Sequence, residues 1–198
     1  MAKRRKVSNP LALAVLAELL AEPLHPYEMG RRLQEHAKDR NIKYNRGSLY
    51  MVVEQLRKAG FVAEQETVRD TQRPERTVYA ITPDGRTELR DWMRELVAEP
   101  QHEYPAFGVS LSLLMVLPPA EAVELLERRK AALTAEVAGI TAELRKAAAE
   151  GVGWLFLIEE EYRVGVLRAE TAFVERLVEQ LREPEFVRTW HETFGRLQ

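Results

Sequence analysis

One change of pattern constrains the fold of this chain more than any other, and it occurs at Gly60. Between Asn45 and Gly60 the apolar residues recur at helical spacing and predict one buried stripe on a helix of about four turns. They are Leu49, Val52, Val53 and Leu56. Asn45 is a favourable N-cap, and Gly60 suits the position just beyond a helix end. Residues 61–68 then alternate as a half-buried strand does, so the pattern predicts a helix followed directly by a strand.

The segments on either side of this pair complete a recognisable order of elements. Residues 76–81 read as a second strand, and the polar segment 69–75 between the strands contains Pro74 and cannot pack in a core. Before residue 45, Pro10 and Pro26 each mark the first turn of a helix, and the sequence predicts helices over 9–21 and 26–39. Three helices joined by short turns in about fifty residues form a helix-turn-helix. With a β-hairpin after them, they predict a winged helix.

The third predicted helix leaves one face free of the core. Its N-terminal end offers the side chains of Asn45, Arg46, Ser48 and Tyr50 and the bare backbone of Gly47. Such groups, beside the positive end of a helix dipole, suit phosphate oxygens and base edges. An ordinary amphipathic helix with a polar cap would look similar, and this helix alone does not decide between the two interpretations.

The charge of the chain is unevenly divided. Residues 1–90 hold 17 Lys and Arg against 12 Asp and Glu, whereas residues 91–198 hold 12 against 19, so a net charge of −2 conceals +5 and −7. Only the N-terminal half is therefore suited to approach a polyanion. Residues 1–8 are basic, and we expect a mobile arm that lies along a phosphate backbone or merely adds solubility.

The composition argues against several other classes of protein. With no cysteine, the chain has neither disulfides nor thiolate metal sites, and it suits a reducing, cytoplasmic location. No segment reads as membrane-spanning. Residues 191–195 begin like a zinc-protease motif but lack the second histidine, and Glu159 to Glu161 read as a solvated helix face. We expect no enzyme, no catalytic residue, no metal and no cofactor.

Several motifs resemble those of PadR-family transcriptional regulators. They lie, in order, at 13–16, 25–29, 46–50, 56–62 and 73–85. The resemblance implies a winged helix-turn-helix that binds DNA, a helical C-terminal dimerisation domain, and in many members repression relieved by an aromatic or drug-like effector. Two departures exist: Met51 stands where the family commonly has proline, and Pro26 where glycine often precedes the tyrosine. Both lie in first turns of helices, so we expect altered local packing without loss of DNA binding.

The C-terminal half is predicted to be almost entirely helical. A fourth helix runs over 83–99, and the aperiodic residues 100–105 mark a boundary. Beyond it we expect a short helix near 107–115, long helices over 119–150 and 154–183, and a last short helix after Pro184. The fold class is mainly α with a small β-hairpin: a winged helix-turn-helix domain over 1–99 and an all-helical dimerisation domain over 100–198.

The two long helices carry one-sided apolar stripes that cannot fully shield each other, so a second copy of the chain is the expected partner. An intrachain helical hairpin that needs no partner is the alternative. The expected interface residues are Leu126, Leu133, Val137, Ile140, Leu155, Ile158 and Tyr162.

These patterns together predict a homodimeric regulator that binds double-stranded DNA of dyad symmetry, and the resemblance implies that it acts as a repressor. The expected DNA-binding residues are Tyr27, Lys43, Asn45, Arg46, Gly47, Ser48, Tyr50, Arg73 and Arg76. A small aromatic effector would contact Trp92, Tyr104, Phe107 and Trp154, although such residues are more often plain core. The rival hypothesis is a winged-helix module that binds protein and no DNA.

Overall fold

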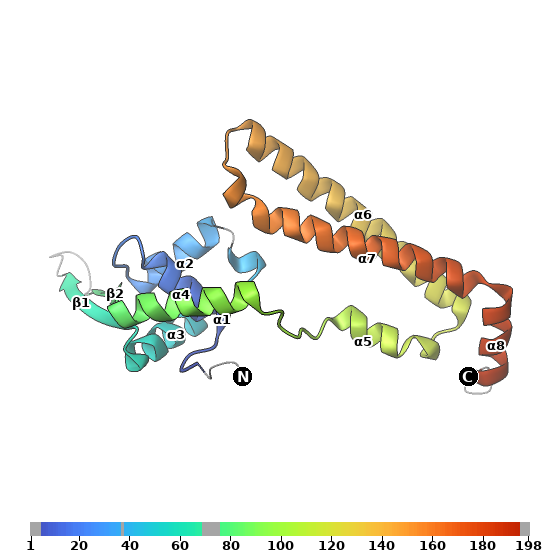
Figure 1. Cartoon of the computed structure of the whole chain (residues 1–198), viewed down its shortest axis with the longest axis horizontal. Coiled ribbons are helices and arrows are strands. Elements are labelled where there is room, and N and C mark those ends of the chain that lie inside the picture. Colours follow the sequence, from blue (N-terminus) through green and yellow to red (C-terminus); the bar gives the residue numbers. More distant parts are fainter. Residues whose placement is uncertain (1–4, 37, 69–75, 195–198) are drawn as a thin grey trace. The chain divides into compact units, whose positions relative to one another are not determined.

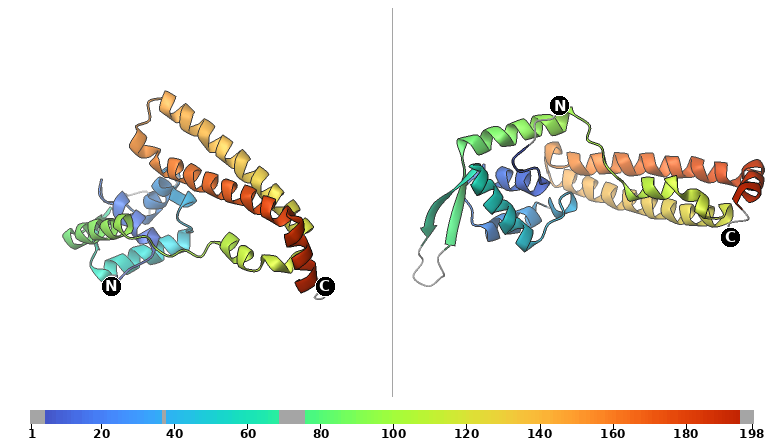
Figure 2. Two further views of the ribbon diagram at one scale, coloured as in Figure 1. Left: turned by 45° about the vertical axis from the view of Figure 1, so that its right-hand side comes forward. Right: turned by 90° about the horizontal axis from the view of Figure 1, so that it is seen from below.

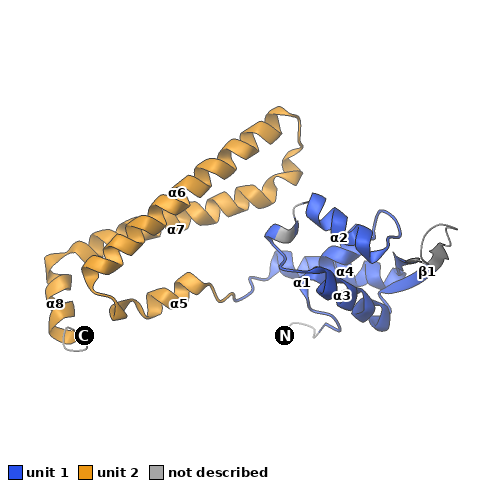
Figure 3. Cartoon of the chain, turned by 180° about the vertical axis from the view of Figure 1, so that it is seen from behind, with its two compact units in different colours: residues 1–102 blue, residues 103–198 orange. Residues whose placement is uncertain are grey.

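The structure, a computed structural model, describes residues 5–36, 38–68 and 76–194. It divides into two compact units, residues 1–102 and residues 103–198 (Figure 3). The described part is helical apart from one antiparallel β-hairpin in the first unit. The predicted fold class, a winged helix followed by a helical region, is confirmed.

The first unit begins with α1 (Pro10–Glu18), α2 (Pro26–Glu35), the short 3-10 helix η1 (Lys38–Arg40) and α3 (Arg46–Ala59) (Figure 1). Local capping sets where α1 and α2 start. The Asn9 side chain accepts a hydrogen bond from the Leu11 amide at 2.9 Å, and His25 Nδ1 accepts one from the Tyr27 amide at 3.1 Å. A proline follows each cap in the first helical turn, where its missing N–H costs nothing. The second helix ends at Glu35, earlier than expected.

The third helix begins and ends where the sequence predicts. Asn45 and Ser48 form a capping box, and Gly60 ends the helix with a φ of 82°, a left-handed conformation that glycine adopts without steric cost. Its stripe of Leu49, Val52, Val53 and Leu56 is buried in the core of the unit. Leu16, Met29 and Leu33 belong to the same core and are also fully inaccessible to solvent.

The hairpin consists of β1 (Val62–Val68) and β2 (Arg76–Ile81), with Val62 opposite Ile81 and a register irregularity between Glu64 and Thr67. Figure 2 shows the two strands side by side, leading away from the end of α3. Leu24, in the connection between α1 and α2, adds a bridge to β2 through two hydrogen bonds of 3.0 Å with Tyr79. This bridge ties the hairpin to the helix-turn-helix. The expected hairpin tip, residues 69–75, lies outside the described residues.

The helix α4 (Pro83–Ala98) follows the hairpin, and its N-terminal end lies next to the C-terminal end of α3 in space. The Thr82 hydroxyl donates to the Gly60 carbonyl at 2.7 Å and accepts from the Gly85 amide at 3.0 Å. The Thr82 amide donates to the Phe61 carbonyl at 3.0 Å. One threonine therefore caps α4 and joins it to the end of α3.

Gly85 provides the close approach that this junction needs. A Cβ atom at Gly85 would lie 2.1 Å from the Phe61 carbonyl oxygen, which is backbone and cannot rotate away. We expect Gly85→Ala to lower the free energy of unfolding by about 1 to 3 kcal/mol, the usual range for overpacking, despite the better helix propensity of alanine. Denaturant unfolding of the variant measures this change. Gly139→Ala, where an added Cβ meets nothing within 4 Å, is the control and should be neutral or stabilising.

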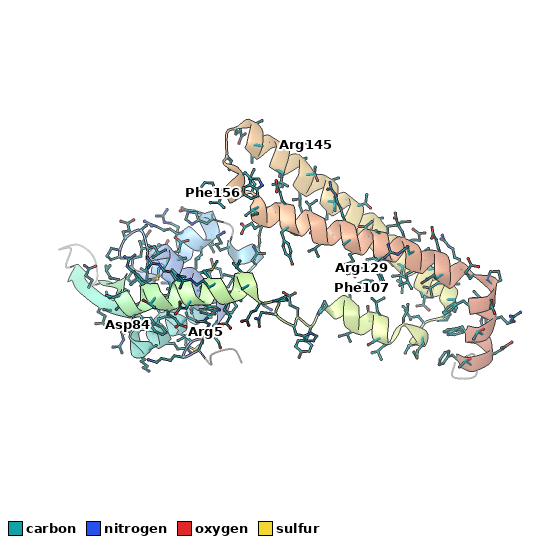
Figure 4. The ribbon with its side chains drawn as sticks, in the orientation of Figure 1. Arg5, Asp84, Phe107, Arg129, Arg145 and Phe156 are labelled. Carbon is teal, nitrogen blue, oxygen red and sulfur yellow. The ribbon has the colours of Figure 1, made fainter. Side chains whose placement is uncertain are left out.

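Arg5 does not belong to a free arm, contrary to expectation. Its guanidinium contacts Glu88 and Glu95 of α4 at 2.5 Å each, and its side chain is only 7% exposed. It also lies over the Trp92 ring, 5.3 Å from the centroid (Arg5 is labelled in Figure 4). Burial opposes the charge, but the hydrogen bonds to the two carboxylates outweigh it and raise the pKa of Arg5 above its ordinary value. Arg5 therefore anchors the segment before α1 to α4.

The second unit comprises α5 (Ala106–Ser112), η2 (Leu114–Val116), α6 (Pro119–Ala149), η3 (Trp154–Phe156), α7 (Ile158–Arg182) and α8 (Pro184–Phe194). Figures 1 and 2 show α6 and α7 side by side and antiparallel. Their shared core is formed by Ala122, Leu126, Val174, Val178 and Leu181. Among the described residues, no helix is both long and apolar enough to cross a membrane.

Candidate nucleic-acid interface

The exposed N-terminal end of α3 carries the strongest candidate site. The buried stripe fixes the rotation of the helix, so Arg46, Gly47, Tyr50 and Met51 face solvent. The tyrosine ring is 38% exposed and the methionine 60%. An α-helix presented in this way fits the major groove of B-form DNA.

Two tyrosines hold Arg46 from different helices. Its guanidinium carbon lies 5.9 Å from the ring centroid of Tyr27, at the start of α2, and 5.9 Å from that of Tyr50. His25 meets Tyr50 edge-on at a centroid distance of 6.3 Å. Cation–π contacts of this kind leave the guanidinium N–H groups free to donate outward. The arrangement orients a planar fork of donors toward solvent before any ligand arrives.

Asn45 and Ser48 use much of their hydrogen-bonding capacity within the protein. The Asn45 side-chain oxygen accepts from the Ser48 amide at 2.8 Å. The Ser48 hydroxyl accepts from the Asn45 amide at 2.9 Å and donates to its carbonyl at 2.8 Å. The side-chain N–H₂ of Asn45 is left as the main donor that this pair offers to a ligand. Their principal role in the protein alone is to hold the start of α3 in place.

The other end of α3 is electrically neutralised. Arg57 donates two hydrogen bonds to the Glu54 carboxylate, from Nε at 2.7 Å and from a terminal nitrogen at 2.8 Å. Lys58 lies 3.5 Å from the same carboxylate, and Glu64 of β1 lies 3.7 Å from Arg57. The positive charge available to a polyanion is therefore concentrated at the N-terminal end.

The hydrogen bonds from Arg57 lower the pKa of Glu54 from 4.5 to about 2. Because the pKa falls on folding, ionised Glu54 contributes stability above about pH 4.5, and that contribution is lost as the pH falls toward 2. We expect a carboxyl carbon titration by NMR to show this low midpoint for Glu54. In Arg57→Gln the midpoint should rise to near the ordinary value, and an unchanged midpoint in that variant would contradict the assignment.

The remaining predicted DNA contacts are only partly visible. Lys43 is exposed in the turn before α3, and Arg76 begins β2. Arg73 lies outside the described residues. Sequence reasoning missed Arg31 and Gln34, which line a hollow of about 190 Å³ together with Tyr27, Arg46 and Tyr50. Arg31 and Gln34 follow Tyr27 by four and seven residues, which places all three on one face of a helix. This spacing could have identified them from the sequence.

The four aromatic residues expected to bind an effector lie in different surroundings. Trp92 belongs to the core of the first unit and is 5% exposed. In the second unit, Tyr104 and Trp154 are 86% and 60% exposed, and the Trp154 indole N–H donates to Glu161 at 3.0 Å. Phe107 lies beneath Arg129, with the guanidinium carbon 3.7 Å from its ring centroid (Figure 4).

The residues expected at a dimer interface fall into two groups. Leu126, Leu133 and Ile140 of α6 are buried within this chain, and Val137 is half-buried. Leu155, Ile158 and Tyr162, in η3 and α7, are 70%, 43% and 74% exposed. Val166 and Phe173 continue this exposed apolar face along α7. Intrachain pairing thus accounts for much of the α6 stripe but leaves the α7 face uncovered.

Comparison with known proteins shows which family the winged helix is similar to. Residues 13–91, which span α1 to most of α4, match the family described as "Transcriptional regulator PadR-like family". We refer to residues 13–91 as the PadR-like domain. No curated protein matches the chain in sequence.

Solved structures share the fold over most of the chain. PadR of Bacillus subtilis in complex with operator DNA is 18% identical, with a TM-score of 0.67, covering 88% of this chain and 99% of that one. The same protein in complex with p-coumaric acid is 17% identical, with a TM-score of 0.67 and coverage of 87% and 99%. The Vibrio cholerae virulence activator AphA is 17% identical, with a TM-score of 0.61 and coverage of 86% and 97%. At these identities the likeness establishes the fold.

The PadR-like domain contains every described element of the candidate interface. Tyr27, Arg46 and Tyr50 all lie within the matched residues 13–91, as does the neutralised Glu54–Arg57 end of α3. Arg5 lies outside that range, although it packs against α4 of the same unit. The PadR-like domain is therefore braced by residues that precede it.

Proposed function

We propose that this PadR-like protein is a homodimeric repressor that binds double-stranded DNA of dyad symmetry. The observation that carries the proposal is the Arg46 guanidinium held between Tyr27 and Tyr50 at the exposed end of a winged-helix recognition helix. The complex of B. subtilis PadR with operator DNA supports it by analogy of fold.

In this proposal each α3 enters the major groove with its N-terminal end leading. Arg46 donates a bidentate pair of hydrogen bonds to a guanine, and Asn45 reads a neighbouring base edge. Ser48, Tyr50 and the Gly47 backbone contact phosphates beside the helix start. Phosphate contacts by Tyr27, Lys43, Arg73 and Arg76 would fix the register without reading sequence. Two such helices about 34 Å apart then read successive turns of the duplex.

The proposed dimer uses the exposed apolar face of α7. Ile158, Tyr162 and Val166 of α7 lie four residues apart and remain exposed within the chain, as does Leu155 of η3 just before them. An apolar face of this length on a monomer is unusual, because exposed patches favour association. We expect sedimentation to give a dimer, which Tyr162→Asp weakens and Tyr162→Phe retains. A monomeric wild type, or equal dimerisation by both variants, would overturn this interface.

The proposal includes release of DNA by a small aromatic effector. A ligand can do this only if it binds the DNA-competent arrangement of the dimer less tightly than another arrangement. The p-coumaric acid complex of B. subtilis PadR supports this by analogy of fold. Trp154, which is 60% exposed in the second unit, remains a proposed contact. Substituting it by alanine should weaken the response of DNA binding to an effector without altering DNA affinity.

The deciding experiment is fluorescence anisotropy with duplexes from the upstream region of the protein's own gene, at two salt concentrations. A regulator that neutralises several phosphates should bind one duplex selectively and lose affinity steeply with salt. Binding to no duplex, or equal weak binding to all of them, would favour the rival hypothesis of a winged-helix module that binds protein.

A further inference from the structure

Met51 occupies the centre of the exposed face of α3. The buried stripe of this helix fixes the direction of the core. At about 100° per residue, Gly47 lies about 170° and Met51 about 150° around the helix from the middle of that stripe, whereas Tyr50 lies only about 110° from it. The methionine is also the more exposed of the two side chains, at 60% against 38% for Tyr50. In the first two turns of α3, Met51 is therefore the side chain most directly opposite the core.

The position of Met51 brings its side chain over the start of the helix. Long side chains in a helix lean toward the helix N-terminus. Met51 follows Gly47 by four residues, and Gly47 has no side chain that would occupy the same surface. In the proposed complex, this end of α3 leads into the major groove. A base that faces the middle of the helix start would therefore meet Met51.

The next residue along this face is occupied by partners within the protein. Glu54, three positions after Met51, accepts hydrogen bonds of 2.7 and 2.8 Å from Arg57, and Lys58 lies 3.5 Å from its carboxylate. A free carboxylate could read cytosine by accepting from its amino group, but this one is already engaged. The centre of the face, formed by Gly47, Met51 and Glu54, thus offers one apolar side chain and no side-chain donor.

We infer that Met51 is a specificity-determining residue that reads a thymine in each half-site through the thymine C5-methyl group. That group is the one methyl that the four standard bases display in the major groove, and it favours apolar contacts. The inference rests on the DNA binding proposed above and adds a base to it. Arg46 reads a guanine by hydrogen bonds, and Met51 reads a thymine of the same half-site by burial of apolar surface.

Replacing thymine by uracil tests this contact directly, because deoxyuridine pairs as thymidine does and lacks only the methyl group. Each thymine of the selectively bound duplex is replaced by dU, one position at a time and in both half-sites together. Fluorescence anisotropy then gives the affinity of the full chain. We expect one position at which the wild type binds about fourfold more weakly per half-site, since burying a methyl-sized group contributes about 0.8 kcal/mol.

Two methionine variants assign the methyl contact to its residue. Met51→Ala should reduce the thymine-to-uracil affinity ratio at that position to about one, because alanine lacks the outer atoms of methionine. Met93, 44% exposed in α4 and outside the proposed interface, provides the matched control, and Met93→Ala should retain the ratio. Both substitutions place a strong helix former at an exposed helical position, so both variants should fold, and circular dichroism checks this.

The outcomes separate this inference from the proposed function. If no uracil position weakens binding, or if Met51→Ala leaves the ratio unchanged, the inference is wrong, while selective duplex binding still supports the regulator. Equal loss of the ratio in Met51→Ala and Met93→Ala would also overturn it, because the effect would then not belong to α3. If the protein selects no duplex at all, the proposed function fails, and this inference fails with it.

Discussion

Replacing Arg5 by alanine is expected to lower the free energy of unfolding of the winged-helix unit by about 3 kcal/mol. The guanidinium is 7% exposed and bridges Glu88 and Glu95, whose side chains are 12% and 22% exposed. Removing it leaves two adjacent carboxylates without a counter-charge in a poorly solvated place. It also removes the contact with the Trp92 ring. Urea unfolding followed by tryptophan fluorescence measures the loss.

A second set of variants separates lost packing from unpaired charge. Arg5→Met keeps an unbranched apolar side chain to pack against the Trp92 ring, and adding Glu88→Gln and Glu95→Gln removes both unpaired carboxylates. We expect the triple variant to recover most of the stability that Arg5→Met loses, because a neutral replacement of a buried ion cluster is often well tolerated. If Arg5→Ala unfolds at the same denaturant concentration as wild type, the bridge contributes nothing and this account of the N-terminal segment is wrong.

Replacing Arg46 by alanine is expected to remove about 1 to 3 kcal/mol of discrimination between the best duplex and a variant of it altered at one guanine. The effect should be specific, because a base-reading fork carries sequence information that a phosphate contact does not. Anisotropy titrations of both duplexes with both proteins measure the difference. Arg46→Lys should also lose discrimination, since a lysine keeps the charge but lacks the planar pair of donors.

Arg57→Ala is the matched control for Arg46→Ala. It removes one positive charge from the same helix, but that charge is already paired with Glu54 by two hydrogen bonds. We expect a small and sequence-independent change in affinity from Arg57→Ala. Equal losses of discrimination in the two variants would show that the whole of α3, and not its N-terminal end, reads the duplex.

Much of the winged helix could be predicted because its signals are local. The cap at Asn45, the stripe from Leu49 to Leu56 and the stop at Gly60 each act within about one turn of the residues they organise. The change to alternation after Gly60 then specifies β1. The second helix was less accurate, since no cap or glycine marked its end at Glu35.

The candidate site was predictable in its residues but less so in its geometry. The sequence places Arg46 and Tyr50 on one end of a helix, but the contact with Tyr27 requires α2 and α3 to meet at a particular angle. The engagement of Asn45 and Ser48 with each other could have been inferred from the capping box alone.

Helices, strands, their caps and the buried stripe of α3 follow from the amino-acid order itself, because each depends on residues only a few positions apart. Tertiary structure alone decides that Arg5 pairs with Glu88 and Glu95, which lie 83 and 90 positions away. The same holds for the Trp190 hydrogen bond to Met115, 75 positions away. Periodicity shows that a helix has an apolar face, but which partner covers that face depends on the path of the backbone through space.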